Sequence, residues 1–161
     1  MNELIVSMMI WISSTTGWQI PDPPEILFLS TIELKSYAYG CDLKPIPKEN
    51  EDICAAKEFW EYDSGAPLGL YDHIDKKIVL NKNFDIESVR DKSILFHELV
   101  HHLQYENDLD KTAPCRAKLE KEAYDLQNQW LKEKYNTNVF DTINMNEMFY
   151  YVITECRDVL Y

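Results

Sequence analysis

The stretch at residues 94–103 reads ILFHELVHHL and contains the pattern His-Glu-x-x-His, which runs from His97 to His101. Positions i and i+4 lie one turn apart on the same face of a helix, so the two imidazoles can bind one ion. Glu98 then stands beside the metal, where it can take a proton from water. The pattern predicts a hydrolase with one zinc ion on His97 and His101 and with Glu98 as the catalytic base.

The apolar residues around this pattern favour a metal site over a chance match. Leu95, Leu99 and Leu103 form one apolar row at i, i+4 and i+8, and Phe96 and Val100 form a second row with Leu103. Two such rows are typical of a helix that is apolar around most of its circumference. Histidine and glutamate side chains on such a helix need partners, because an unpartnered buried polar group costs free energy. A bound metal ion provides that partner.

Catalytic zinc usually has three protein ligands and one open position. The metzincin extension is excluded, because its Gly and His positions are Gln104 and Asn107 here. A second helix expected at residues 115–135 offers Glu120 and Glu122. At about 100° per residue, Glu120 borders the apolar arc of that helix more closely than Glu122. We expect Glu120 as the third ligand and keep Glu122 as the reserve.

HELVH followed by Glu120-Lys121-Glu122-Ala123 resembles the gluzincin clan of zinc metallopeptidases, in which a glutamate on a second helix is the third ligand. Four longer stretches are similar to a bacterial family of short, uncharacterised HExxH proteins: WISSTTGWQIPDPPEILFLS, GLYDHIDKKIVL, ILFHELVHHLQ and EKEAYDLQ. The resemblance implies zinc on His97, His101 and Glu120, with Glu98 as general base. It implies no particular substrate.

One position departs from the gluzincin pattern. Many gluzincins carry an Asp four residues after the ligand glutamate, where it orients a zinc histidine, but position 124 here is Tyr. We therefore expect another orienting partner, either Asp125 or a backbone carbonyl. Hydrolysis of an amide also needs a donor to the developing oxyanion. Tyr105, Tyr124 and Tyr150 are the candidates.

Three functions remain open from the sequence. The favoured one is a small metallopeptidase that cleaves peptide bonds in a peptide or protein substrate. The second is a zinc-binding regulatory or scaffold protein without turnover, because the short chain has no second lobe to wall a deep cleft. The third is a metal-free helical interaction protein. Metal content separates the third from the others, and turnover separates the first two.

The length predicts the number of domains, and the net charge disfavours two classes of partner. The 161 residues predict a single domain, 1–161, with a single core. The net charge of −12 disfavours nucleic acid and anionic membranes as partners. The oligomeric state is left open.

The N-terminal and cysteine patterns predict a cytoplasmic protein. Leu4 to Ile12 is apolar but follows Glu3 and has no basic segment before it, unlike an export signal. The four cysteines form no CxxC pair, so a structural zinc knuckle is not expected. Without an export signal we expect free thiols.

The remaining pattern predicts a compact, zincin-like α+β domain, with a small twisted sheet packed on the HELVH helix and on the second ligand-bearing helix. The strand at 78–80 is expected either at an exposed edge, where a peptide can pair with it, or inside the sheet. Asp85 or Asp91 is expected to cap the HELVH helix. The other expected elements are helices at 2–16, 31–39 and 144–158, strands at 25–30, 69–72 and 77–80, and a partly helical segment at 42–66.

Overall fold

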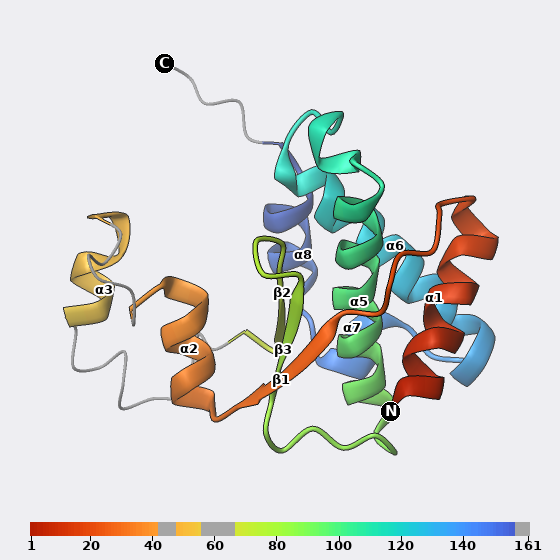
Figure 1. Cartoon of the computed structure of the whole chain (residues 1–161), viewed down its shortest axis with the longest axis horizontal. Helices are drawn as coiled ribbons and strands as arrows, with labels where there is room; N and C mark the ends of the chain where they lie inside the picture. Colours follow the sequence, from red (N-terminus) through yellow and green to blue (C-terminus); the bar gives the residue numbers. More distant parts are fainter. Residues whose placement is uncertain (42–47, 56–66, 157–161) are drawn as a thin grey trace. The chain divides into compact units, whose positions relative to one another are not determined.

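The computed structural model describes residues 1–41, 48–55 and 67–156 (Figure 1). They combine helices with one small sheet, which confirms the predicted α+β class. The chain falls into two compact units, Glu25–Phe84 and a second unit of Met1–Pro24 with Asp85–Tyr161. The expectation of a single domain stays a prediction.

The sheet unit contains β1 (Glu25–Leu29), β2 (Gly69–Asp72) and β3 (Lys77–Asn81) in the order β1-β3-β2. β3 pairs in parallel with β1 and antiparallel with β2. The strands predicted at 69–72 and 77–80 therefore form an antiparallel hairpin. Of the two alternatives for residues 78–80, the internal strand is the observed one. This agrees with the apolar run Ile78-Val79-Leu80, which is fully buried.

Local hydrogen bonds explain the helices and the turn of this unit. The helix predicted at 31–39 is α2 (Thr31–Tyr39), where Ser30 and Glu33 form a capping box at the start and Gly40 ends the helix in the left-handed conformation. Asp72 accepts hydrogen bonds from the backbone of the hairpin loop and from the hydroxyl of Tyr37. A 3-10 turn, η1 (Lys48–Asn50), and α3 (Glu51–Ala55) follow. The rest of the predicted 42–66 segment lies outside the described residues.

The helical unit consists of α1 (Asn2–Thr16), α5 (Val89–Glu106), a 3-10 turn η2 (Leu109–Lys111), α6 (Arg116–Tyr135), α7 (Val139–Ile143) and α8 (Glu147–Thr154). α5 packs against α1, α6 and α7, and α6 also packs against α8 (Figure 1). Phe96 joins three helices, since its ring stacks on Trp130 of α6 at 4.7 Å and meets the edge of Trp11 of α1 at 5.5 Å. None of the helices in the described ranges combines the length and apolar character needed to span a bilayer.

Two predictions about this unit need correction, and one of its helices was not predicted. Ser88 caps α5 by accepting from the backbone N–H of Asp91, so neither Asp85 nor Asp91 is the cap. The predicted helix at 144–158 is shorter, because Asn146 caps α8 and the helix ends at Thr154. Residues 157 and 158 lie outside the described part. α7 was not predicted, because its five residues are too few to show a helical period.

The expectation of free thiols is wrong. Cys41 is bonded to Cys54 in the sheet unit, and Cys115 is bonded to Cys156 in the helical unit. The second bond ties the residue that precedes α6 to the segment that follows α8. Spacing alone could not show these pairs, because four cysteines allow three pairings and the absent CxxC pattern excludes only one kind of site.

Candidate metal centre

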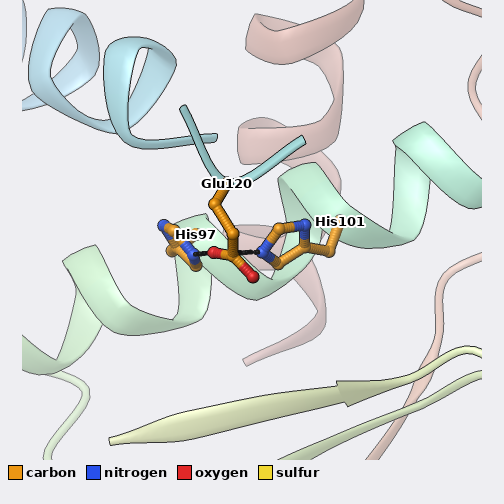
Figure 2. Close-up of side chains that lie close together, drawn as sticks. All are labelled: His97, His101 and Glu120. Atoms are coloured by element: carbon orange, nitrogen blue, oxygen red, sulfur yellow. Dashed lines mark hydrogen bonds and ion pairs between the residues drawn. The ribbon is translucent and has the colours of Figure 1, made fainter. Parts of the chain in front are cut away.

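His97, His101 and Glu120 converge in the helical unit (Figure 2). α5 carries both histidines on one face, and α6 brings Glu120 between them from the neighbouring helix. Oε2 of Glu120 lies 3.3 Å from Nε2 of His97 and 3.2 Å from Nε2 of His101, and the two Nε2 atoms are 3.1 Å apart. The three atoms form a nearly equilateral triangle.

The dimensions of this triangle fit a tetrahedral metal site. Zinc binds imidazole nitrogen and carboxylate oxygen at about 2.0–2.2 Å, so two ligands at a tetrahedral angle are separated by about 3.3 Å. The three observed separations, from 3.1 to 3.3 Å, agree with that value. Both histidines are buried, and Glu120 is half-buried. These residues therefore fit a zinc ion without rearrangement.

A buried glutamine orients His97. Nδ1 of His97 lies 3.1 Å from Oε1 of Gln127, on α6. The Nε2 atom of Gln127 donates to the carbonyl oxygen of Ser93 at 2.9 Å and to its hydroxyl at 2.6 Å. Because a carbonyl oxygen only accepts, the amide nitrogen of Gln127 must face Ser93. Its oxygen therefore accepts a hydrogen bond from Nδ1–H of His97.

A second buried glutamine orients His101 in the same way. Oε1 of Gln104 lies 2.8 Å from Nδ1 of His101. The amide nitrogen of Gln104 donates to the carbonyl oxygen of Leu119 and to Oε2 of Glu122, both at 3.0 Å. His101 therefore also carries its proton on Nδ1 when it is neutral.

These tautomers leave three electron-pair donors facing one another. With both protons on Nδ1, each Nε2 presents a lone pair, and Glu120 adds a carboxylate oxygen. Three such atoms within van der Waals range repel unless a cation lies among them. The cluster thus has the chemistry of a metal site, and among the described residues it is the group of histidine, cysteine and acidic side chains that is arranged to hold an ion.

The same repulsion shifts the pKa values in the absence of a metal. Burial raises the pKa of Glu120, but its interactions with His101 and His97 hold that pKa far below its ordinary value of 4.5. Burial lowers the pKa of His101, but hydrogen bonding to Glu120 and the charges of Glu120 and Glu98 raise it above 6.5. In the metal-free protein, a proton on His101 thus supplies the positive charge among these ligands.

Glu98 lies close to this cluster without belonging to it. Its side chain is 7% exposed, and its charge raises the pKa values of both His101 and Tyr124. It is not one of the three converging ligands. The predicted base therefore stands beside the site, as the HExxH pattern requires.

The structure separates the two glutamates that the sequence offered. Glu120 joins the histidines, whereas Glu122 accepts from the side chain of Gln104 and is exposed. Glu122 also borders a surface hollow of 530 Å³ along α6, which is lined in part by Trp18, Leu119 and Leu126. Neither histidine nor Glu120 lines this hollow. The hollow is therefore separate from the metal cluster.

Tyrosine rings lie against one side of the cluster. The ring of Tyr124 packs on His97 with the centroids 4.2 Å apart, and Tyr150 meets Tyr124 at 5.8 Å. Burial, followed by the charges of Glu120 and Glu98, raises the pKa of Tyr124, so its hydroxyl keeps its proton. Tyr105 is half-buried in the last turn of α5. The site thus brings together Tyr124 and Tyr150 of the three predicted oxyanion donors.

The two orienting glutamines were missed in the sequence. The predicted partners were Asp125 or a backbone carbonyl, but Asp125 binds Lys121 and Tyr150 instead. The available signal was helical spacing, because Gln104 stands three residues after His101, and Gln127 stands seven residues after Glu120 on the same face of α6. Glutamine on a buried face needs a partner, which makes such positions worth testing.

Comparison with known proteins shows the family of this chain. A family model described as a domain of unknown function (DUF6647) matches residues 1–158. No curated protein matches the chain, and neither does any solved structure. Since the family model covers nearly the whole sequence, the chain belongs to the DUF6647 family.

Proposed function

We propose that this protein is a zinc-dependent hydrolase, a small metallopeptidase that cleaves peptide bonds in a peptide or protein substrate. The observation that carries the proposal is the convergence of three proton-free donors, Nε2 of His97, Nε2 of His101 and Oε2 of Glu120. Because hydrogen bonds at Nδ1 of both histidines leave these three electron pairs facing one another, a cation is the group that would best stabilise the cluster. A zincin-like fold is part of the same proposal, supported by the HExxH helix and the neighbouring helix that brings the glutamate.

The donor set favours a single zinc ion. Two imidazole nitrogens and one carboxylate oxygen are ligands that zinc prefers, and magnesium or calcium would be bound mainly by oxygen atoms. Three protein ligands also leave one coordination position open, which is typical of catalytic rather than structural zinc sites. When bound, zinc would lower the pKa of water toward neutrality and polarise the carbonyl of the scissile bond.

The protein's own residues supply the proton transfers. Glu98 would accept the proton of the attacking water and pass it to the leaving amine nitrogen. Tyr124 keeps its phenolic proton and packs on His97, so it is the best placed of the three tyrosines to donate to the developing oxyanion. Tyr150 and Tyr105 are the remaining candidates for this role.

Metal content and turnover test the proposal. Protein purified in full length should bind about one equivalent of zinc, as expected for a single site. His97→Ala should not retain zinc. Zinc-loaded protein should cleave a mixed peptide library, read by mass spectrometry. Stoichiometric zinc without any cleavage would support the alternative, a regulatory or scaffold protein, and absence of zinc binding at neutral pH would remove both.

The proposed compartment changes with the disulfides. The cytoplasmic prediction rested on the N-terminal pattern, which lacks the features of an export signal, and free thiols were expected to follow from it. Disulfides form and persist mainly in oxidising compartments. The bonds Cys41–Cys54 and Cys115–Cys156 therefore favour an oxidising compartment as the place of action. Alkylation of the denatured but unreduced protein should modify no cysteine, and a mass increase corresponding to four alkylated thiols would restore the cytoplasmic proposal.

A further inference from the structure

Two glutamines beside the metal cluster are almost completely shielded from water. Gln104 is 0% exposed, and Gln127 is 1% exposed. A buried amide costs free energy unless its oxygen and nitrogen both find partners. Both glutamines meet this condition, with the oxygen on a histidine and the nitrogen on a backbone carbonyl.

The backbone carbonyls that accept hydrogen bonds from these two glutamines belong to residues close to the proposed metal ligands. Gln127 reaches from α6 to Ser93, which stands one helical turn before His97 on α5. Gln104 reaches in the opposite direction, from α5 to Leu119, which immediately precedes Glu120 on α6. The two amides thus form reciprocal bridges between the helices. Each bridge fixes one histidine ring and also the backbone close to a metal ligand, His97 for Gln127 and Glu120 for Gln104.

We infer that Gln104 and Gln127 are positioning residues, which hold His101 and His97 with the proton on Nδ1 and the Nε2 lone pair toward the metal before the metal binds. The inference rests on the proposed metal site. Metal-binding histidines generally need a partner on the other ring nitrogen, because it fixes the tautomer and the ring orientation. In this protein neutral amides take that role.

The surroundings require an amide rather than a carboxylate. In the place of Gln127, a glutamate would turn one oxygen toward the carbonyl oxygen of Ser93 at about the present 2.9 Å. In the place of Gln104, it would face both the carbonyl oxygen of Leu119 and the carboxylate of Glu122. An amide avoids this repulsion, because its nitrogen donates where its oxygen accepts. This explains how the site is built without the gluzincin Asp at position 124.

A third histidine on α5 provides an internal contrast. Nε2 of His102 lies 2.9 Å from the backbone carbonyl oxygen of Asp22, so this ring carries its proton on Nε2. Neighbouring histidines of one helix therefore have opposite tautomers. The difference follows from what faces each ring, an amide oxygen at Nδ1 or a carbonyl at Nε2.

Nitrogen-15 NMR of the histidine rings tests the inference. In the full-length protein freed of metal and held at alkaline pH, His97 and His101 should show the Nδ1–H tautomer and His102 the Nε2–H tautomer. This needs no variant, so it does not depend on whether a mutant folds. Observation of Nε2–H on His97 or His101 before zinc is added would overturn the inference, even if zinc then binds.

Matched variants separate positioning from mere packing. Methionine approximates the length of glutamine without its hydrogen bonds. Gln127→Met should release the tautomer of His97 and leave that of His101 fixed, and Gln104→Met should do the reverse. A loss of stability alone would not produce this crossed pattern. Gln129→Met is the control, because Gln129 lies exposed on α6 and donates to Glu133.

Zinc affinity, measured by competition with a chelator, gives the second readout. Either of the two variants should weaken zinc binding by about 10- to 100-fold, as the loss of such partners commonly does, and Gln129→Met should not change it. Unchanged affinity in both variants would overturn the inference and leave the hydrolase proposal standing. Correct tautomers in a protein that binds no zinc would instead remove the hydrolase proposal.

Discussion

His97 and His101 face each other through their Nε2 atoms at 3.1 Å, although in the neutral state neither atom carries a proton. Two lone pairs at that distance repel, and the carboxylate oxygen of Glu120 adds a third electron-pair donor. The cluster therefore always needs a positive charge. A metal ion supplies it in the proposed enzyme, and a proton on His101 supplies it otherwise.

This competition predicts opposite pH dependences for the metal-free and zinc-bound protein. The lowered pKa of Glu120 contributes stability above its ordinary 4.5, which is lost as the pH falls through the lowered value. The raised pKa of His101 contributes stability below its ordinary 6.5, which is lost as the pH rises through the raised value. The metal-free cluster is therefore most stabilising in mildly acidic solution.

Zinc requires neutral His101, so its stabilising effect should grow as the pH rises from about 5 to about 8. Thermal unfolding with and without zinc across this range measures the difference. His101→Ala is the control and should show no zinc effect at any pH. An equal zinc effect at both ends of the range would contradict the protonation of His101.

Glu98→Gln should keep zinc and lose hydrolysis. Glutamine has the same shape as glutamate but cannot accept the proton of water, and general bases commonly contribute about 10²- to 10⁴-fold to rate. Zinc content and peptide cleavage are measured on the same preparation. Glu87→Gln is a matched control, since Glu87 is exposed and precedes the cap of α5. Loss of zinc from a folded Glu98→Gln protein would show that Glu98 is a ligand.

The sequence was sufficient for the features that depend on local periodicity. Helices α1 and α2, strands β2 and β3 and the HExxH helix all follow from spacing within a few residues. The choice of Glu120 over Glu122 also follows from helical geometry, because the apolar arc of α6 decides which side faces α5.

Features that depend on contacts between distant segments could not be predicted. Gln127 reaches Ser93 across 34 residues, and Gln104 reaches Leu119 across 15, so neither pairing has a local signal. The disulfides have the same character, since Cys115 and Cys156 are 41 residues apart. The prediction of the residue that caps α5 was wrong for a different reason. Asp85, Ser88 and Asp91 are all suitable residue types, and only the backbone conformation selects Ser88.

Removal of the Cys115–Cys156 bond should destabilise the helical unit. The bond closes a separation of 41 residues, which in the chain-entropy description contributes about 4 kcal/mol. The double variant Cys115→Ser/Cys156→Ser should lower the free energy of unfolding in urea by about 2–4 kcal/mol. The measurement uses circular dichroism under non-reducing conditions. An unchanged midpoint would indicate that the bond is absent from the protein in solution.

Zinc affinity of two glutamate variants tests the third ligand. Glu120→Ala removes the oxygen that lies between the two histidines, so zinc would keep only two protein ligands and should be lost to a mild chelator. Glu122→Ala is the matched control, two residues along the same helix. It removes one of two acceptors for the amide of Gln104, and the carbonyl of Leu119 remains. Because Glu122 is exposed, its loss should change stability by only about 0.5 kcal/mol or less and leave zinc bound. The reverse result, with zinc lost only from Glu122→Ala, would mean that α6 is rotated about its axis when the metal is bound.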